Sequence, residues 1–378
     1  MKIGFYSSRP LEDKRNWSGT MFKIYEQLIK KGYEITWIPL IEYTEKENKI
    51  FNKIEKTYNK IFNRGYNKHL FIYKAKIAAK RLKEKISQLD IDILFVPTKL
   101  NDIAYLSIKK PIIYLNDANA GQLLNYNPYY CGFGLLSKIE TKYIEKLALK
   151  NADFLVFSSD WASNYAIEKY GINKEKVKTI KFGANIDEPS HIIYNKNFTT
   201  FTFLFLAVEW EKKGGQLAYE CLKILRDKNY PVQMLVVGCS PPIEENWVKI
   251  VPFLNKNNPE ELIEIQNYLQ QSHFLFVPTR SEAYGIVFCE AAAYGLPIIS
   301  TNTGGVSAPV KHGYNGFLLP ENSGSKDYAN QIEILLKEPS KIIQMSKNSR
   351  LLYEKELNWK KWGDEFEKII EKVSSKSI

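Results

Sequence analysis

Residues 273–297 read HFLFVPTRSEAYGIVFCEAAAYGLP, and this stretch indicates the architecture of the second half of the chain. An apolar run of strand length comes first. Gly285 then opens an alanine-rich segment that predicts a helix, which Gly295 and Pro297 end. A buried strand followed by a tight turn and a helix is the unit of a parallel sheet that is covered by helices on both faces.

The same alternation extends along the whole chain. Further strand-like runs are KIGFYSS, EITWIPL, DILFVP, IIYLND, FLVFSS, VKTIKFG, FTFLFLAVEW, VQMLVVG and PIISTN. Helical segments lie between them, and 378 residues favour two domains over one. We therefore predict an α/β fold with two doubly wound, Rossmann-like domains, over residues 1–188 and 189–355, joined by the polar stretch at 185–200. Residues 356–378 predict an amphipathic helix with an apolar side for core packing, formed by Trp359, Trp362, Phe366, Ile369 and Ile370.

Several classes of protein and site are disfavoured by the composition. No apolar run is long enough to span a bilayer, and the N-terminal MKIGFYSSRP reads as a first strand, not as a secretory signal. The four cysteines are scattered without a CxxC pair, which argues against zinc and disulfides and suits a reducing cytoplasm. The four histidines share no metal-ligand spacing, and Asp90-Ile-Asp92 reads as a solvated turn before a strand. We expect a cytoplasmic protein without a metal site.

The net charge of +11 is concentrated in one region. Twelve basic residues lie between Lys49 and Lys85, against only Glu55 and Glu84. A solvated helical face explains this run about as well as attraction to an anionic surface, either phospholipid or an anionic substrate. Apolar residues at helical spacing among the bases would suit a helix lying on a membrane: Ile54, Tyr58, Ile61 and Phe62. No nucleic-acid-binding motif accompanies the charge, so we expect no nucleic-acid partner.

Two carboxylates, Glu282 and Glu290, flank the start of the alanine-rich helix. Ligands of doubly wound sheets bind beyond the carboxyl ends of the strands, where Glu282 is expected. Backbone N–H groups near Gly285 and Ile286 could hold a phosphate at the helix N-terminus. A loop carboxylate could bind sugar hydroxyls, and Glu290 could bind the two hydroxyls of a ribose. Alternatively, Glu290 is only a surface residue of an alanine-rich helix.

The stretch resembles the donor-site motif of the GT-B glycosyltransferases of the family 4 type, the glycosyl transferases of group 1, in which seven residues separate two glutamates. The resemblance is specific in the second half of the chain and looser in the first. Other segments that carry it are FSSDWA (157–162), KFGANID (181–187), VEWEKKGG (208–215), FLNKNNPEEL (253–262), TNTGGV (301–306) and HGYNGFLLP (312–320).

The resemblance implies roles for donor-side residues. Lys213 would contact the donor diphosphate, Glu282 would hold hydroxyls of the donor sugar, and Glu290 would bind the ribose. The backbone at Tyr284, Gly285 and Ile286 would approach the sugar and phosphates, and residues 253–262 would line the base pocket. Many relatives carry an arginine shortly before the lysine. This chain has none there, and Lys212 is the candidate substitute.

On the acceptor side, the resemblance implies that Gly19, in NWSGT, lies in a loop that approaches the phosphate and the acceptor. Some relatives carry a histidine where this chain reads IIYLNDANAG. Asp117 is the titratable residue of that segment. It would orient an acceptor hydroxyl or act as a base, or it merely caps the next turn. The last helix would cross back onto the N-terminal domain.

The expected activity is that of a retaining, hexosyltransferase-like glycosyltransferase. It would move a sugar from a nucleoside-diphosphate sugar to a glycan or lipid-linked acceptor in cell-surface polysaccharide or glycolipid synthesis, with no cofactor beyond the donor. The charge suggests peripheral contact with an anionic membrane at its inner face. Two alternatives are a nucleotide-sugar epimerase of GT-B fold and a non-catalytic, glycosyltransferase-like binding subunit.

Overall fold

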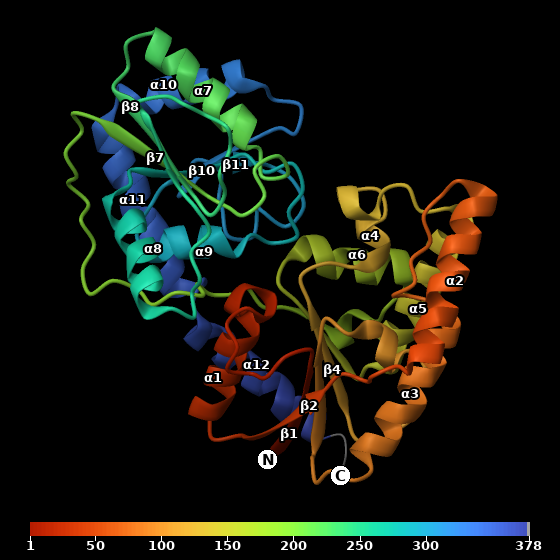
Figure 1. The fold of residues 1–378 in the computed structure, drawn as a ribbon. Coiled ribbons are helices and arrows are strands. Elements are labelled where there is room, and N and C mark those ends of the chain that lie inside the picture. The colour runs from red at the N-terminus through yellow and green to blue at the C-terminus, as the bar shows by residue number, and fades with distance from the viewer. Residues whose placement is uncertain (376–378) are drawn as a thin grey trace. The chain divides into compact units, whose positions relative to one another are not determined.

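A computed structural model describes residues 1–375, and the chain forms two compact units (Figure 1). Unit 1 comprises Met1–Ile180 together with the segment that begins at Gly363, and unit 2 comprises Lys181–Trp362. The sequence placed these boundaries after residues 188 and 355. The structure places them after Ile180 and Trp362, so the last helix is shared between the units.

Unit 1 is built on a six-stranded parallel sheet in the order β2-β1-β3-β4-β5-β6. Its strands are β1 (Lys2–Ser7), β2 (Glu34–Pro39), β3 (Ile93–Pro97), β4 (Ile112–Asn116), β5 (Phe154–Phe157) and β6 (Val177–Thr179). Its α-helices are α1 (Thr20–Lys30), α2 (Glu45–Phe62), α3 (Ile72–Ile86), α4 (Ala120–Leu123), α5 (Leu135–Asn151) and α6 (Asp160–Tyr170). Short 3₁₀ turns occupy η1 (Asn16–Gly19), η2 (Leu100–Ile103), η3 (Pro128–Tyr130) and η4 (Lys174–Lys176).

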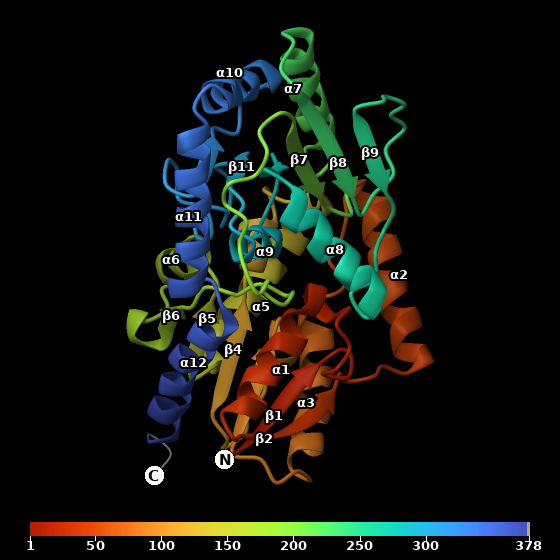
Figure 2. The same cartoon turned by 90° about the vertical axis from the view of Figure 1, so that its left-hand side faces the viewer.

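Alternating side chains of β3 show that both faces of this sheet are buried. Leu94 and Val96 belong to a core that includes residues of α3, α5 and α6. Phe95 points the other way. The centroid of its ring lies 4.9 Å from that of Phe5 and 5.0 Å from that of Phe366. Phe366 lies on α12 (Trp359–Ser374), so the part of α12 beyond Gly363 covers this second face of unit 1 (Figure 2). All five apolar residues expected on α12 are buried, which confirms their core role.

The basic run corresponds to α2, α3 and the turn between them. Lys68 pairs with Glu55 at 2.9 Å, and Arg81 pairs with Glu47 at 2.7 Å. The expected membrane-facing apolar side of α2 is wrong in part, because Tyr58 is only 9% exposed. Its ring packs in a small core that also contains Phe51, Tyr66 and Phe71, with Ile54 against it.

Unit 2 contains a second parallel sheet in the order β12-β11-β10-β7-β8-β9. Its strands are β7 (Phe201–Leu206), β8 (Val232–Val237), β9 (Val248–Val251), β10 (Phe274–Val277), β11 (Ile298–Thr301) and β12 (Gly316–Leu319). Its helices, besides the start of α12, are α7 (Gly215–Asp227), α8 (Pro259–Gln271), α9 (Ile286–Ala293), α10 (Ser325–Leu336) and α11 (Pro339–Lys355). Helices α7 and α10 pack side by side on one face, and α9 and α11 pack together on the other (Figure 1).

Each sheet has a point at which the order of its strands reverses. In unit 1 the chain passes from β1 to β2 on one side and continues with β3 on the other. In unit 2 it passes from β7 to β8 and β9, and then returns to β10 on the opposite side of β7. Loops that leave the carboxyl ends of two such strands diverge, which opens a crevice for a ligand. The loops after β7 and β10 are therefore the expected location of a ligand site in unit 2.

Candidate functional site

The loops after β7 and β10 touch at the reversal point of unit 2. Gly214 has a φ of +76°, and a Cβ there would lie 2.0 Å from the carbonyl oxygen of Pro278, so only glycine fits. The backbone N–H of Arg280 donates a 3.0 Å hydrogen bond to the carbonyl oxygen of Lys212. This contact fixes Lys213 next to the loop that carries Glu282.

Lys213 and Glu282 form an ion pair, and both side chains are largely buried. The carbonyl oxygen of Glu282 accepts a 3.2 Å hydrogen bond from the N–H of Gly305, in the turn after β11. Three neighbouring loops of the sheet thus converge on this pair. The structure brings together two residues that are 69 positions apart and to which the resemblance assigns the diphosphate and the donor sugar.

The N-terminus of α9 lies directly after this loop. Gly285 is the residue before the helix and has a φ of +89°, and no side chain caps the first turn, which starts at Ile286. Tyr284 is buried, and its hydroxyl donates a 3.0 Å hydrogen bond to the carbonyl oxygen of Phe182. Its phenol is thus occupied in the core, which leaves its backbone for a ligand. A bound anion would accept hydrogen bonds from the N–H groups of this first turn.

Glu290, one turn further along α9, is only 2% exposed and forms an ion pair with Lys256. The alternative of a surface residue is therefore wrong. Lys256 lies between β9 and α8, in the segment 253–262 that the sequence assigned to the base pocket. Lys256 itself could not be singled out from the sequence. A lone lysine in a polar loop gives no signal, because its partner is 34 positions away.

Lys212 also lies in the loop after β7, and its Nζ is 3.1 Å from Oε2 of Glu209. The ammonium is therefore held beside a carboxylate of its own loop. Lys212 and Lys213 together supply two cations at the carboxyl edge of β7, the strand beside β10. A lysine presents a point charge without the fork of a guanidinium, so neither can reproduce a bidentate arginine contact.

In unit 1, Gly19 ends the loop after β1 and precedes α1 with a φ of +95°. Trp17 and Ser18 before it adopt left-handed backbone, with φ of +51° and +55°. Thr98, directly after β3, has a φ of +66°, which is unfavourable for a β-branched residue. Three non-glycine residues with positive φ thus flank the reversal point of unit 1. Such strain is characteristic of ligand-binding loops.

Asp117 directly follows β4, and its N–H donates a 3.0 Å hydrogen bond to Oδ1 of Asn116. The turn after it is held by Glu145 of α5, a residue that the sequence did not reveal. The carboxylate of Glu145 accepts hydrogen bonds from the N–H groups of Ala120 (2.5 Å) and Gly121 (2.7 Å) and from the hydroxyl of Tyr170. Burial raises the pKa of Glu145 to about 7, although these hydrogen bonds act in the opposite direction.

This pKa predicts a pH-dependent stability. Between about pH 4.5 and pH 7 the folded chain binds a proton at Glu145 that the unfolded chain has released, so the free energy of unfolding falls as the pH rises through this range. The contribution amounts to about 3 kcal/mol. Urea unfolding at pH 5 and pH 8 should show a smaller loss for Glu145→Gln than for the parent. Glu168→Gln, at an exposed position of α6, is the control. Equal losses in all three proteins would contradict the assignment.

Other candidate residues have structural roles. Asp90 and Asp92 both bind Lys2 at the amino end of β1, as expected for a solvated turn. Nδ1 of His273 accepts a 3.0 Å hydrogen bond from the backbone N–H of Thr202. Burial lowers the pKa of His273 to about 4. Within residues 1–375, no group of three or more His, Cys, Asp or Glu residues could hold a metal ion.

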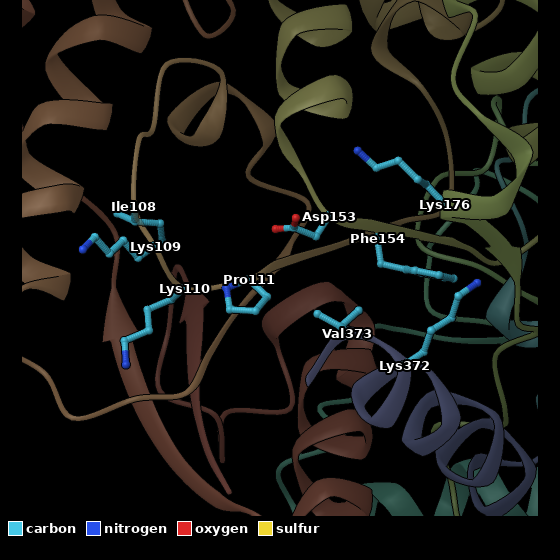
Figure 3. Close-up of a pocket in the computed structure, with 9 residues that line it drawn as sticks. All are labelled: Ile108, Lys109, Lys110, Pro111, Asp153, Phe154, Lys176, Lys372 and Val373. Atoms are coloured by element: carbon cyan, nitrogen blue, oxygen red, sulfur yellow. The ribbon is translucent and has the colours of Figure 1, made fainter. Parts of the chain in front are cut away.

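A cavity of about 410 Å³ lies at the opposite edge of the unit 1 sheet, near the amino ends of β4 and β5 (Figure 3). Four of its lining residues are lysines, but their ammonium groups do not converge on one point. Lys176 donates to the carbonyl oxygen of Lys150 at 3.2 Å, and Lys372 donates to that of Glu175 at 3.1 Å. The cavity is therefore no candidate for the site.

Comparisons with known proteins bear on the unit 2 site. Residues 187–352, which include every donor-side residue discussed above, match the family model of glycosyl transferases group 1. The resemblance to this family is confirmed. An uncharacterized glycosyltransferase of Methanocaldococcus jannaschii is 27% identical over 64% of this chain and 65% of its own length. The capsular polysaccharide biosynthesis glycosyltransferase CapM of Staphylococcus aureus is 26% identical over 55% of this chain and 58% of CapM. The chain thus spans about three fifths of these relatives.

Among solved structures, HepE of Anabaena in complex with UDP and glucose superimposes with a TM-score of 0.63. The alignment covers 98% of this chain and 99% of HepE at 16% sequence identity, which shows a shared fold. The two Rossmann-like units therefore have the GT-B fold, which the group 1 resemblance implied.

Proposed function

We propose that the protein is a glycosyltransferase that moves a sugar from a nucleoside-diphosphate sugar to a glycan or lipid-linked acceptor. One observation carries the proposal: the Lys213–Glu282 and Lys256–Glu290 ion pairs lie on loops and a helix at the carboxyl edge of the unit 2 sheet, beside the uncapped N-terminus of α9. This arrangement suits a nucleoside-diphosphate sugar. Lys213 and the N–H groups of α9 would meet the diphosphate, Glu282 would meet the sugar, and Glu290 would meet the ribose.

The chemistry follows from where charge develops. When the bond from the sugar to the diphosphate breaks, negative charge grows on the leaving diphosphate, and preorganised cations and N–H groups stabilise it. Lys213 and the first turn of α9 would supply these groups. Without a ligand, the two carboxylates hold the lysines in place. Donor binding would turn Lys213 toward the diphosphate and leave Glu282 for the sugar hydroxyls.

The finer features rest on the group 1 resemblance. We propose retention of the anomeric configuration, a role in cell-surface polysaccharide or glycolipid synthesis, and a cytoplasmic location. The similarity to CapM, whose name refers to capsular polysaccharide, supports the second of these features. None of the helices described within residues 1–375 is long and apolar enough to cross a membrane. On the acceptor side, Asp117 would orient the acceptor hydroxyl, and the loop that ends at Gly19 would approach the phosphate and the acceptor.

We expect no dependence on an added divalent metal, because Lys213, Lys212 and the α9 N-terminus would neutralise the leaving diphosphate. Transfer measured with and without EDTA should proceed at rates within about twofold of each other, since the charge stabilisation comes from fixed protein groups. A loss of activity in EDTA that Mg²⁺ or Mn²⁺ restores would contradict this expectation.

The function is tested by incubating the protein with UDP-, GDP- and ADP-sugars and an envelope extract of the source cells, which supplies the acceptor. One donor should release its nucleoside diphosphate and transfer its sugar, and NMR should show the donor's anomeric configuration in the product. Conversion of the donor to an epimer without acceptor would support the epimerase alternative. Nucleotide binding without turnover would support the non-catalytic subunit.

A further inference from the structure

Helix α5 begins with its apolar side chains turned to solvent and its polar ones turned inward. Leu135 is 75% exposed, and Leu136 and Ile139 are also exposed. On its inner side, Ser137 and Thr141 are buried. An amphipathic helix of a globular domain normally does the reverse, burying its apolar stripe and exposing its polar face.

Hydrogen bonds explain why the polar face stays inside. The hydroxyl oxygen of Ser137 accepts a 2.8 Å hydrogen bond from the backbone N–H of Asn67. The side-chain amide of Asn67 donates a 3.2 Å hydrogen bond to the hydroxyl of Thr141. Glu140 accepts the N–H of Ile72 at 3.0 Å and the hydroxyl of Tyr66. The orientation of α5 is therefore fixed, and turning its apolar residues inward would break all these bonds.

The end of α2 extends the same exposed region. The N–H of Gly65 donates to the carbonyl oxygen of Gly132 at 2.9 Å, and the N–H of Gly134 donates back to Gly65 at 2.9 Å. These bonds join the segment after α2 to the start of α5. Ile61 and Phe62, in the last turn of α2, are 66% and 58% exposed. Together they form what we call the apolar surface: Ile61, Phe62, Tyr129, Leu135, Leu136 and Ile139.

The charges around this surface are almost all positive. Lys60 and Arg64 lie at the end of α2, and Lys138, Lys142 and Lys146 lie on α5. Residues 56–64 contain no carboxylate, and residues 125–146 contain only two. Of these, Glu145 is buried, and Glu140 is engaged by Tyr66 and Ile72. Large apolar side chains with basic neighbours suit the interface of an anionic bilayer. There the apolar side chains insert among the lipids, and the basic side chains face the lipid headgroups.

We propose that unit 1 docks on anionic phospholipid membranes through the apolar surface and its surrounding lysines and arginine. A contact between two copies is disfavoured, because a symmetric contact would place the same basic residues opposite one another. The surface also lies at the carboxyl edge of the unit 1 sheet. Helix α4 follows β4 and Asp117 there, and Lys138 of α5 donates to Asn125, just after α4, at 3.0 Å. Docking would thus bring the edge that carries Asp117 to the membrane. The proposal does not depend on the nature of the reaction.

The test is co-flotation of the full chain with vesicles of phosphatidylcholine alone or of phosphatidylcholine with about 30% phosphatidylglycerol, whose headgroup is anionic. The variant Leu135→Ser/Leu136→Ser/Ile139→Ser removes three apolar side chains. Because all three are exposed, it should keep the parent's melting temperature. The matched control, Ile263→Ser/Ile334→Ser, changes exposed apolar residues of unit 2.

We expect the parent and the control to bind the anionic vesicles equally and the triple variant to bind at least about tenfold more weakly, since burial of apolar side chains would be lost. Lys138→Gln/Lys142→Gln should weaken binding to anionic vesicles but not to neutral ones. Equal binding of the parent and the triple variant would overturn the proposal, as would a parent that does not bind anionic vesicles. Sedimentation showing a dimer that the triple substitution dissociates, without vesicle binding, would assign the surface to a second copy instead.

Discussion

Replacing Glu290 with alanine is expected to lower the affinity for the donor nucleotide by at least about 100-fold, which corresponds to about 3 kcal/mol. Two hydrogen bonds from ribose hydroxyls to a carboxylate contribute about 1.5–3 kcal/mol each. The substitution also leaves the ammonium of Lys256 without its buried partner, at the segment assigned to the base. Both effects act at one end of the nucleotide, so the loss should appear in binding before any transfer is measured.

Isothermal titration of UDP, GDP and ADP into the parent and the variant measures this loss. Glu244→Ala, an exposed glutamate of unit 2, is the matched control and should bind as the parent does. Melting curves of the three proteins separate lost binding from lost folding. If Glu290→Ala folds and binds the nucleotide as tightly as the parent, the ribose is not held by Glu290.

The Lys213→Ala variant is expected to lose about 10³-fold in kcat/KM, because one preorganised charge that faces the leaving group is worth about that much. The loss should lie mainly in kcat, since the negative charge on the diphosphate grows toward the transition state. Glu282 would lose the partner with which it is paired in the absence of a ligand. Lys212→Ala should show a smaller loss, about tenfold, if this lysine acts as a second point charge without bidentate geometry.

Steady-state rates over a range of donor concentrations separate the two parameters. Lys326→Ala, which removes an exposed lysine of α10, serves as the control and should behave as the parent does. A Lys213→Ala enzyme with unchanged kcat and a raised KM would show that Lys213 only binds the donor. An enzyme unchanged in both would remove Lys213 from the site.

The parts of the fold that follow from local pattern could be predicted from the sequence. The turn at Gly285 between β10 and α9 is one of these, because a strand of buried apolar residues, a glycine and an alanine-rich helix follow one another directly. The burial of Trp362 and Phe366 follows from the spacing of apolar residues on α12. Each of these features depends on neighbours along the chain, which a sequence displays.

Features that depend on partners far along the chain could not be predicted. Tyr58 reads as a membrane-facing residue of a basic helix, but Phe51, Tyr66 and Phe71 enclose it. Glu145 reads as a charge on a surface helix, yet it holds the turn after Asp117. The Lys256–Glu290 pair joins two segments that only the parallel sheet brings together. In each case, the pattern of neighbouring residues does not identify the partner, because the partner lies far along the chain.

The most direct test of the central claim is a crystal structure of the protein with the nucleoside diphosphate that it binds. The donor site at the β7–β10 reversal predicts the diphosphate at the first turn of α9, within reach of Lys213, and the ribose hydroxyls on Glu290. A nucleotide bound elsewhere, with the Lys213–Glu282 and Lys256–Glu290 pairs undisturbed, would contradict that site and the function proposed from it.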